Sequence, residues 1–148
     1  MDFHYQYSVN APAEKLWDFV TDIPAVGMCI PGAQSVEAVD DAYAGSVKVR
    51  VGPVALTLNG KIRVQEMDAD ARRISLTGEG ADQRVPGNVG VRIKMLVEPK
   101  DDTTSQLTVD SEANIMGKLG EFGQGIIKRK ADGIMKEFGQ NLTKSVQS

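Results

Sequence analysis

Apolar and polar residues alternate along most of the first 115 positions, which is the pattern of strands that bury one face. The alternation covers residues 2–9 and returns over 47–51, 54–64, 74–76, 89–97 and 106–115. Short polar segments such as Asp40-Asp41 and Lys100-Asp101-Asp102 separate these stretches and are typical of turns. One-sided alternation with short turns predicts an antiparallel sheet that packs on one face and meets solvent on the other.

Two regions follow helical periodicity instead. Pro12 opens a helix that ends near Asp22, and residues 23–30 can form a second short helix. From Lys118 to about Val146 the pattern is helical again, and no proline interrupts it. This region predicts one helix of about 29 residues and roughly 43 Å.

The expected order is a strand, one or two short helices, about six further strands and a long helix. A single long helix buries its apolar face across one face of a curved sheet. The sequence therefore predicts a single α+β domain over residues 1–148. In it, a curved antiparallel sheet of six or seven strands wraps around the C-terminal helix.

Composition narrows the function classes. The 148 residues are 41% hydrophobic and 25% charged with a net charge of −3, which argues against a nucleic-acid partner. The only cysteine, Cys29, excludes an internal disulfide, and the only histidine, His4, lies on the outward side of the first strand, so no metal site is expected. Because neither a long apolar run nor a signal-peptide pattern is present, we expect a cytoplasmic protein.

Glycine is frequent in the expected C-terminal helix, which contains Gly120, Gly123, Gly125, Gly133 and Gly139. Each costs about 0.5–1 kcal/mol relative to alanine. At 100° per residue, Gly120 and Gly123 fall near the centre of the stripe facing the sheet. The other residues of this stripe are Met116, Ile127, Ala131, Ile134 and Phe138. Two interpretations remain open: close packing of the helix backbone on the sheet, or room left for a ligand.

The apolar stripe is wider in the first half of this helix. Leu119, Phe122 and Ile126 extend it sideways. They either pack under the 23–33 segment or stay exposed as an apolar patch for a partner or a membrane surface.

Five segments carry a family resemblance through their order and spacing, and together they span the chain. They are residues 12–17 (PAEKLW), 29–33 (CIPGA), 47–54 (VKVRVGPV), 78–82 (GEGAD) and 117–123 (GKLGEFG). This set resembles the CoxG family, which takes its name from a component of carbon monoxide dehydrogenase. The family belongs to the START-like (SRPBCC, polyketide cyclase-like) superfamily.

The resemblance implies a helix-grip fold of START or Bet v 1 type with an apolar cavity under the last helix. It also implies a non-catalytic accessory protein of a molybdenum hydroxylase of carbon monoxide dehydrogenase type. Family members are associated with membrane attachment and with a lipophilic quinone, menaquinone or ubiquinone, with no covalently bound cofactor. The expected location is therefore the cytoplasm, with peripheral contact at the inner face of the cytoplasmic membrane.

The inward faces of the strands and the last helix are almost entirely apolar, which suits a hydrophobic small molecule. The residues expected to bind it are Val49, Leu56, Leu58, Ile62, Leu76, Val91, Ile93, Met95, Val109, Ala113, Met116, Gly120, Gly123 and Ile127. The residues expected at the cavity mouth or against a partner are Met28, Ile30, Leu119, Phe122 and Ile126.

Two other functions stay open. A cyclase or hydratase of the same superfamily needs an ionisable or hydroxyl group near the substrate. Ser111, Glu79, Asp82 and Cys29 are the candidates for that group. The second alternative is a docking adaptor that binds no ligand.

Overall fold

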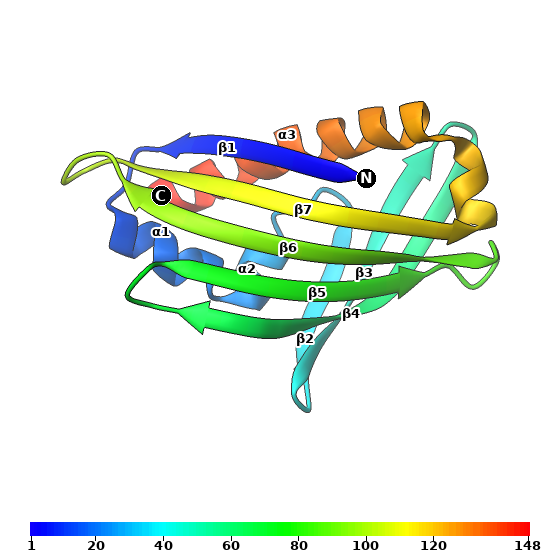
Figure 1. Cartoon of the computed structure of the whole chain (residues 1–148), viewed down its shortest axis with the longest axis horizontal. Helices are drawn as coiled ribbons and strands as arrows, with labels where there is room; N and C mark the ends of the chain where they lie inside the picture. The colour runs from blue at the N-terminus through cyan, green and yellow to red at the C-terminus, as the bar shows by residue number, and fades with distance from the viewer.

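The computed structural model describes residues 1–148 and contains seven strands, three α-helices and one 3₁₀ helix, η1 (Figure 1). The strands are β1 (Asp2–Val9), β2 (Ala33–Val39), β3 (Ala42–Val51), β4 (Val54–Asp68), β5 (Arg73–Ala81), β6 (Gly87–Pro99) and β7 (Ser105–Gly117). The helices are α1 (Ala13–Val20), α2 (Ile23–Gly27), η1 (Lys118–Phe122) and α3 (Gln124–Gln147).

All seven strands form one antiparallel sheet in the order β1-β7-β6-β5-β4-β3-β2. The first strand pairs with the last, from Asp2 opposite Glu112 to Val9 opposite Ser105. The predicted α+β architecture, with a curved antiparallel sheet and a long C-terminal helix, is confirmed. The apolar pattern did not identify β2, because this edge strand is exposed or half-buried along its whole length.

The sheet curves strongly at β4, whose two halves run in different directions in Figure 1. Gly60 lies near the middle of this strand and pairs with Gly45 of β3 and Gly80 of β5. A Cβ atom at Gly60 would overlap the backbone carbonyl oxygen of Glu79. Glycine therefore allows the strands to approach closely where the sheet bends around α3.

The C-terminal helix predicted over 118–146 is interrupted. The chain leaves β7 at Gly117, forms η1, and reaches α3 only after Gly123. Gly117 and Gly123 have φ angles of 72° and 88°, which favour glycine and turn the backbone. Apolar residues continue through this segment, so periodicity alone did not reveal the break.

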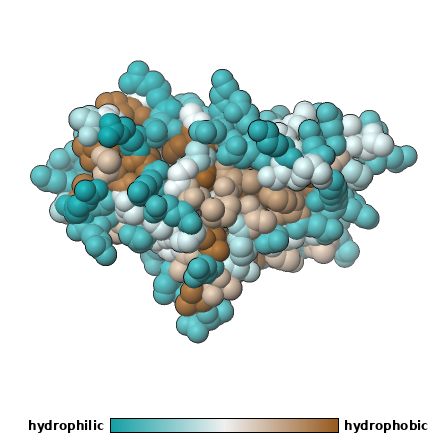
Figure 2. Space-filling view, turned by 180° about the vertical axis from the view of Figure 1, so that it is seen from behind, coloured by the Kyte–Doolittle hydropathy of each residue, from teal (hydrophilic) through white to brown (hydrophobic).

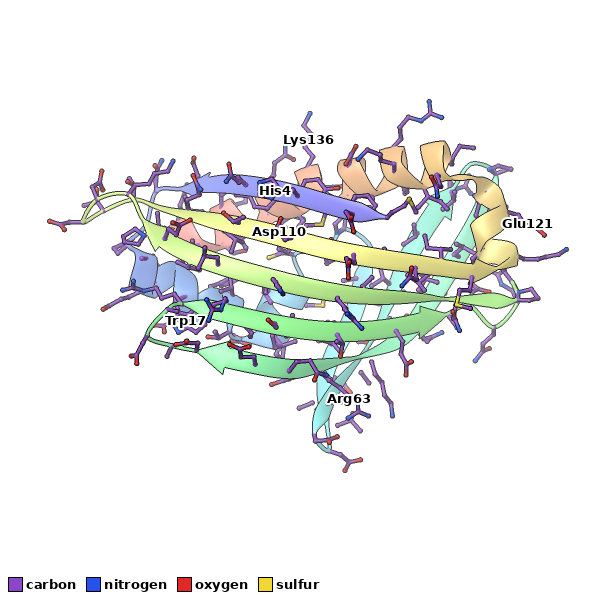
Figure 3. The ribbon with its side chains drawn as sticks, in the orientation of Figure 1. His4, Trp17, Arg63, Asp110, Glu121 and Lys136 are labelled. Carbon is purple, nitrogen blue, oxygen red and sulfur yellow. The ribbon has the colours of Figure 1, made fainter.

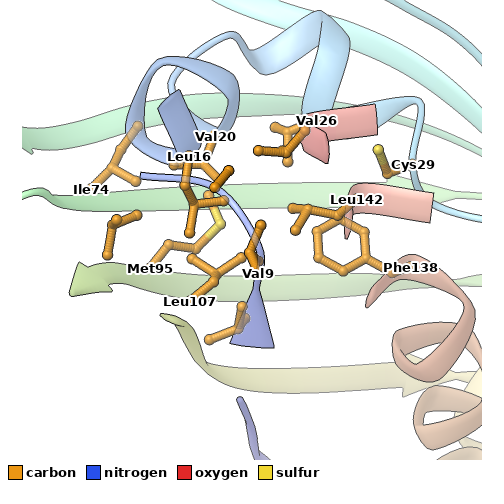
Figure 4. Close-up of a cluster of buried hydrophobic side chains, with 14 of the residues drawn as sticks. Val9, Leu16, Val20, Val26, Cys29, Ile74, Met95, Leu107, Phe138 and Leu142 are labelled. Atoms are coloured by element: carbon orange, nitrogen blue, oxygen red, sulfur yellow. The ribbon is translucent and has the colours of Figure 1, made fainter. Parts of the chain in front are cut away.

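Most of the buried side chains form one core between the sheet and the C-terminal half of α3. The core includes Leu16 and Val20 of α1, Val26 of α2, and Phe138 and Leu142 of α3 (Figure 4). A smaller cluster of Val51, Leu56 and Leu119 lies at the η1 end of the molecule.

Hydrogen bonds attach α3 to the rest of the fold from Asp132 onward. Tyr5 donates to Asp132 and Tyr7 donates to the Met135 carbonyl, both at 2.7 Å. Asn141 donates to the Cys29 carbonyl at 2.9 Å. The four buried residues of α3 are Phe138, Gly139, Leu142 and Val146, all in its C-terminal half. Residues 124–131 contain no buried residue and make no side-chain hydrogen bond to the rest of the fold, although Lys128 Nζ lies 5.4 Å from the centroid of the Phe3 ring. This first part of α3 is therefore the more weakly held part of the helix.

Candidate functional site

An apolar cavity of about 160 Å³ lies beside the smaller cluster, under η1 and the N-terminal half of α3. Eleven of its twelve lining residues are hydrophobic, and Lys130 is the exception. They are Val49, Val51, Leu56, Leu58, Val89, Ile115, Leu119, Phe122, Ile127, Lys130, Ala131 and Ile134. This composition favours an apolar ligand whose affinity comes from buried surface.

Strand pairing places the floor of the cavity. Val49 of β3 lies opposite Leu56 of β4, and Val89 of β6 lies opposite Ile115 of β7. Because side chains alternate along a strand, these residues share the concave face on which α3 lies. The inward-facing apolar side chains of these four strands therefore form one continuous apolar surface.

Asp82 fixes the loop between β5 and β6, next to the smaller cluster. Its carboxylate accepts hydrogen bonds from the backbone N–H groups of Thr57 (2.7 Å), Arg84 (2.6 Å) and Val85 (3.1 Å). These backbone donors, the Thr57 N–H first, hold the pKa of Asp82 below its usual range. The hydrogen bond from the Val85 N–H holds Val85 where it packs against the smaller cluster. Both oxygens of the Asp82 carboxylate already accept hydrogen bonds from the backbone.

Six of the nineteen residues expected at the ligand or the mouth line this cavity, namely Val49, Leu56, Leu58, Leu119, Phe122 and Ile127. Leu76, Met95 and Val109 are instead buried within the main core, and Ile30, Ile62 and Ile93 pack against it. Val91 and Ala113 are half-buried partners on β6 and β7. The alternating pattern shows which residues face inward, but not which part of the interior is closely packed.

The structure corrects the expected positions of three of these residues. Met116 follows Ile115 in β7, so its side chain lies on the opposite face of the sheet, and it is 61% exposed. Gly120 lies in η1 rather than in a helix stripe facing the sheet, and Gly123 is the exposed junction before α3. The interrupted helix is the reason for all three differences.

The wide part of the apolar stripe packs against a different segment from the expected one. Leu119 is buried against Val51 and Leu56, and Phe122 packs against the same cluster. The 23–33 segment instead contributes to the main core through Cys29. Ile126 and Met28 are exposed.

Only the packing interpretation of the glycines is supported at the cavity, because none of the five lines it. A Cβ at Gly139 would overlap the Tyr7 ring, so this glycine permits close packing of α3 on β1. At Gly125 and Gly133 a Cβ would meet nothing within 4 Å. Packing therefore gives no reason for glycine in the N-terminal half of α3, where it lowers helix stability.

The four side chains considered for catalysis do not line the cavity. Ser111 is half-buried opposite Phe3, and Glu79 is exposed on β5. Cys29 is buried in the main core, and burial raises the pKa of its thiol, which disfavours the nucleophilic thiolate. His4 is exposed on β1, with its Nδ1 2.5 Å from an Asp110 oxygen.

The cavity residues that sequence reasoning missed are Val51, Val89, Ile115, Lys130, Ala131 and Ile134. Ala131 and Ile134 lie on the predicted helical stripe together with Ile127. Val51, Val89 and Ile115 belong to the predicted strand alternation. Their apolar periodicity was visible, whereas their meeting at one end depended on the curvature of the sheet.

Comparison with solved structures defines the class of fold. A conserved protein from Geobacillus kaustophilus matches with a TM-score of 0.88 at 21% identity, over 99% of this chain and 95% of that chain. A START superfamily protein from Mycobacterium smegmatis gives 0.74 at 13% identity, over 99% and 97%. The Zhui aromatase/cyclase from Streptomyces sp. R1128 gives 0.70 at 15% identity, over 99% and 93%. The chain thus has the START or polyketide cyclase-like fold.

The family follows from the sequence itself. The model of the carbon monoxide dehydrogenase CoxG family matches residues 6–147. The chain belongs to this family, and the predicted resemblance is confirmed. No curated protein gives a significant match. None of the helices combines the length and the hydrophobicity that crossing a membrane requires.

Proposed function

We propose that this protein binds a lipophilic quinone, such as menaquinone or ubiquinone, in the apolar cavity under η1 and α3. It does so as a non-catalytic accessory protein of a molybdenum hydroxylase of carbon monoxide dehydrogenase type. The observation that carries the ligand proposal is the lining, which is apolar at eleven of twelve residues. The hydroxylase partner is supported by the family to which the chain belongs.

The groups present at the cavity favour binding over catalysis. General acid–base or nucleophilic catalysis requires a positioned ionisable or hydroxyl group. The only polar side chain at this cavity is Lys130, and Asp82 nearby is held by three backbone donors. Lys130 instead suits a hydrogen bond to a quinone carbonyl oxygen at the edge of an apolar pocket.

The size of the cavity limits what it holds without rearrangement. A cavity of about 150 Å³ accommodates one benzene-sized ring, and pockets for drug-sized ligands are about 300–1,000 Å³. A quinone with an isoprenoid tail therefore requires η1 and the N-terminal half of α3 to move outward. Gly123, Gly125 and Gly133 make this segment deformable, since no packed side chain constrains them.

The test is equilibrium binding of menadione, a quinone ring without an isoprenoid tail, followed by a short-tailed menaquinone. Ala131→Phe places a ring in the cavity and should weaken binding at least tenfold. Gln140→Phe adds the same side chain at an exposed position of α3 and should leave the affinity within about twofold. Unchanged affinity in a folded Ala131→Phe variant would exclude the cavity as the binding site.

Extraction of the natively purified protein with organic solvent, followed by mass spectrometry, identifies the natural ligand. A near-stoichiometric quinone is the expected result. The accessory role is tested by adding the loaded protein to a purified molybdenum hydroxylase of carbon monoxide dehydrogenase type and measuring quinone reduction. If the rate depends only on free quinone, the proposed partnership is wrong even when the ligand is correct.

A further inference from the structure

A second hollow, of about 390 Å³, opens directly beside the apolar cavity, between α3 and the later residues of β3. The two spaces share Val49, Lys130 and Ile134 in their walls. The remaining residues that line this polar hollow are Pro31, Gly32, Lys48, Arg129, Gly133 and Glu137. Seen from behind, the η1 end shows brown apolar atoms with teal polar side chains next to them (Figure 2). A ligand in the apolar cavity therefore has a polar space beside it.

The sheet leaves this hollow open because β2 covers only part of β3. Ala33, the first residue of β2, pairs with Val47, and the Lys48 N–H donates to the Gly32 carbonyl oxygen at 2.9 Å. β3 continues to Val51, and no strand pairs with it on this side beyond Lys48. The end of β3 and α3 therefore form two walls of the hollow without a strand between them.

Backbone contacts of residues 29–33 fix one rim of the hollow. Gly32 has a φ angle of 86°, and a Cβ atom there would overlap the Lys48 carbonyl oxygen. Asn141 of α3 donates to the Cys29 carbonyl at 2.9 Å, which ties this segment to the helix. In the helical wall, a Cβ at Gly133 would meet nothing within 4 Å. The hollow is therefore bounded by fixed backbone, and it stays open because Gly133 has no side chain.

Cations predominate in the walls of the polar hollow. The walls contain Lys48, Arg129 and Lys130, and a single carboxylate, that of Glu137. None of these four residues takes part in an ion pair. Three positive charges against one negative charge leave the hollow positive in a chain whose net charge is −3. Such a site complements an anionic group.

We propose that the cavity and the polar hollow together bind an apolar carboxylic acid, with its ring in the cavity and its carboxylate in the hollow. Such a ligand goes beyond the proposed quinone, which carries no charge, and adds a second class of ligand for the same cavity. A carboxylate accepts charge-assisted hydrogen bonds from guanidinium and ammonium groups, which are roughly twice as strong as hydrogen bonds between neutral groups. Lys130 lies where the two spaces meet. Because the cavity of about 160 Å³ accommodates one ring, an aromatic acid is the expected ligand.

Two probes of the same shape isolate the role of the charge. Naphthoate and its amide, naphthamide, have the same ring system, but only naphthoate is an anion at neutral pH. Equilibrium binding should be tighter for naphthoate by about tenfold or more, because hydrogen bonds to a charged group are the stronger ones. This preference should shrink when salt is raised, because ions screen the charges. Equal affinities of the two probes would overturn the proposal.

Substitutions at two glycines of α3 locate the carboxylate. Gly133→Asp adds a negative charge to the wall of the hollow and should abolish the preference for naphthoate. Gly125→Asp is the matched control, because Gly125 lines neither space and a Cβ there also meets nothing within 4 Å. Gly133→Ala fills the same position without a charge and should keep the preference. If Gly133→Asp, shown to be folded by urea denaturation, bound naphthoate like Gly125→Asp, the carboxylate would lie outside the hollow and the proposal would be wrong.

Removal of a cation gives an independent measurement that adds no new group. Arg129→Gln should weaken the binding of naphthoate by about fivefold or more and should change that of naphthamide much less. Lys136→Gln removes a cation of the same helix whose side chain points away from the fold (Figure 3), and it should change neither affinity. An equal effect of Arg129→Gln on both probes would contradict a contact between Arg129 and the carboxylate.

Menadione distinguishes this carboxylic acid from the proposed quinone. If both bind, menadione and naphthoate should compete, because they share the cavity. Menadione binding without any preference for naphthoate over naphthamide would overturn the carboxylic acid alone. A preference for naphthoate without menadione binding would refute the proposed quinone and leave the carboxylic acid as the ligand.

Discussion

Tyr7 shows how one side chain fixes the distance between β1 and α3. Its hydroxyl donates to the Met135 carbonyl at 2.7 Å, and its ring packs edge-on against Phe138, with centroids 5.9 Å apart. Burial raises the pKa of Tyr7 to about 12, so the hydroxyl stays protonated and keeps its donor role at physiological pH. The ring then occupies the place of a side chain at position 139.

Substitution by alanine should therefore change the stability of the protein in opposite directions at two glycines of α3. Gly139→Ala should destabilise the protein by about 1–3 kcal/mol, because the new Cβ overlaps a ring held by its hydrogen bond. Gly133→Ala should stabilise it by about 0.5–1 kcal/mol, because the Cβ meets open space and alanine favours helix. Urea denaturation measures both. Equal effects of the two substitutions would contradict this account.

Asp82 gives the loop beside the cavity a pH dependence. Since its pKa is lowered in the folded state, its contribution to stability is fully present above the unfolded pKa of about 3.9 and is lost as the pH falls further. The free energy of unfolding of the wild type should therefore exceed that of Asp82→Asn at neutral pH.

The difference between these two proteins should shrink below about pH 4, where protonation weakens the acceptors in the wild type as well. Asp70→Asn is the control, because Asp70 is exposed and makes no side-chain hydrogen bond or ion pair. It should show no such trend. If the difference in free energy of unfolding between wild type and Asp82→Asn stayed the same at low pH, the charge of Asp82 would not be the cause of its effect on stability.

At the scale of elements, the strands were the most predictable part of the structure. One-sided burial produces a period of two that is visible in the sequence, and it located β1, β6 and β7 to within a few residues. The alternating pattern did not predict β2, because neither face of this strand is consistently buried. Its position depends on pairing with β3, which is a tertiary contact that local periodicity does not contain.

The break between η1 and α3 shows a second limit of periodicity. Leu119, Phe122 and Ile127 follow helical spacing, although the φ angle of 88° at Gly123 separates the first two from the third. The glycine content did signal an unusual segment, but not whether the glycines serve packing, ligand space or a turn. For the same reason the sequence located α3 beyond residue 124 and misplaced Met116, Gly120 and Gly123.

At the scale of the whole molecule, the main core and the apolar cavity lie at opposite ends. The main core contains seventeen buried residues and is closed by α1, α2 and the C-terminal half of α3. The cluster beside the cavity contains only three buried residues, surrounded by half-buried ones. A molecule built in this way can open at the cavity while the main core stays folded.

Two buried leucines test this division. Leu142→Ala in the main core should cost about 2–5 kcal/mol of stability, because its surroundings are packed and a cavity remains. Leu119→Ala should cost less, at the low end of that range or below, since its half-buried neighbours can move into the space. The effects on quinone affinity should be reversed, because Leu119 lines the cavity and Leu142 does not.

Urea denaturation and menadione binding, measured on the same two variants, decide whether the two ends are independent. Separate responses would mean that the η1 end can change shape to admit a ligand without loosening the rest of the fold. If Leu142→Ala, measured where it is still folded, weakened quinone binding as much as Leu119→Ala, the two ends would be energetically coupled. Entry of the ligand would then require a rearrangement that reaches the main core rather than a local opening at α3.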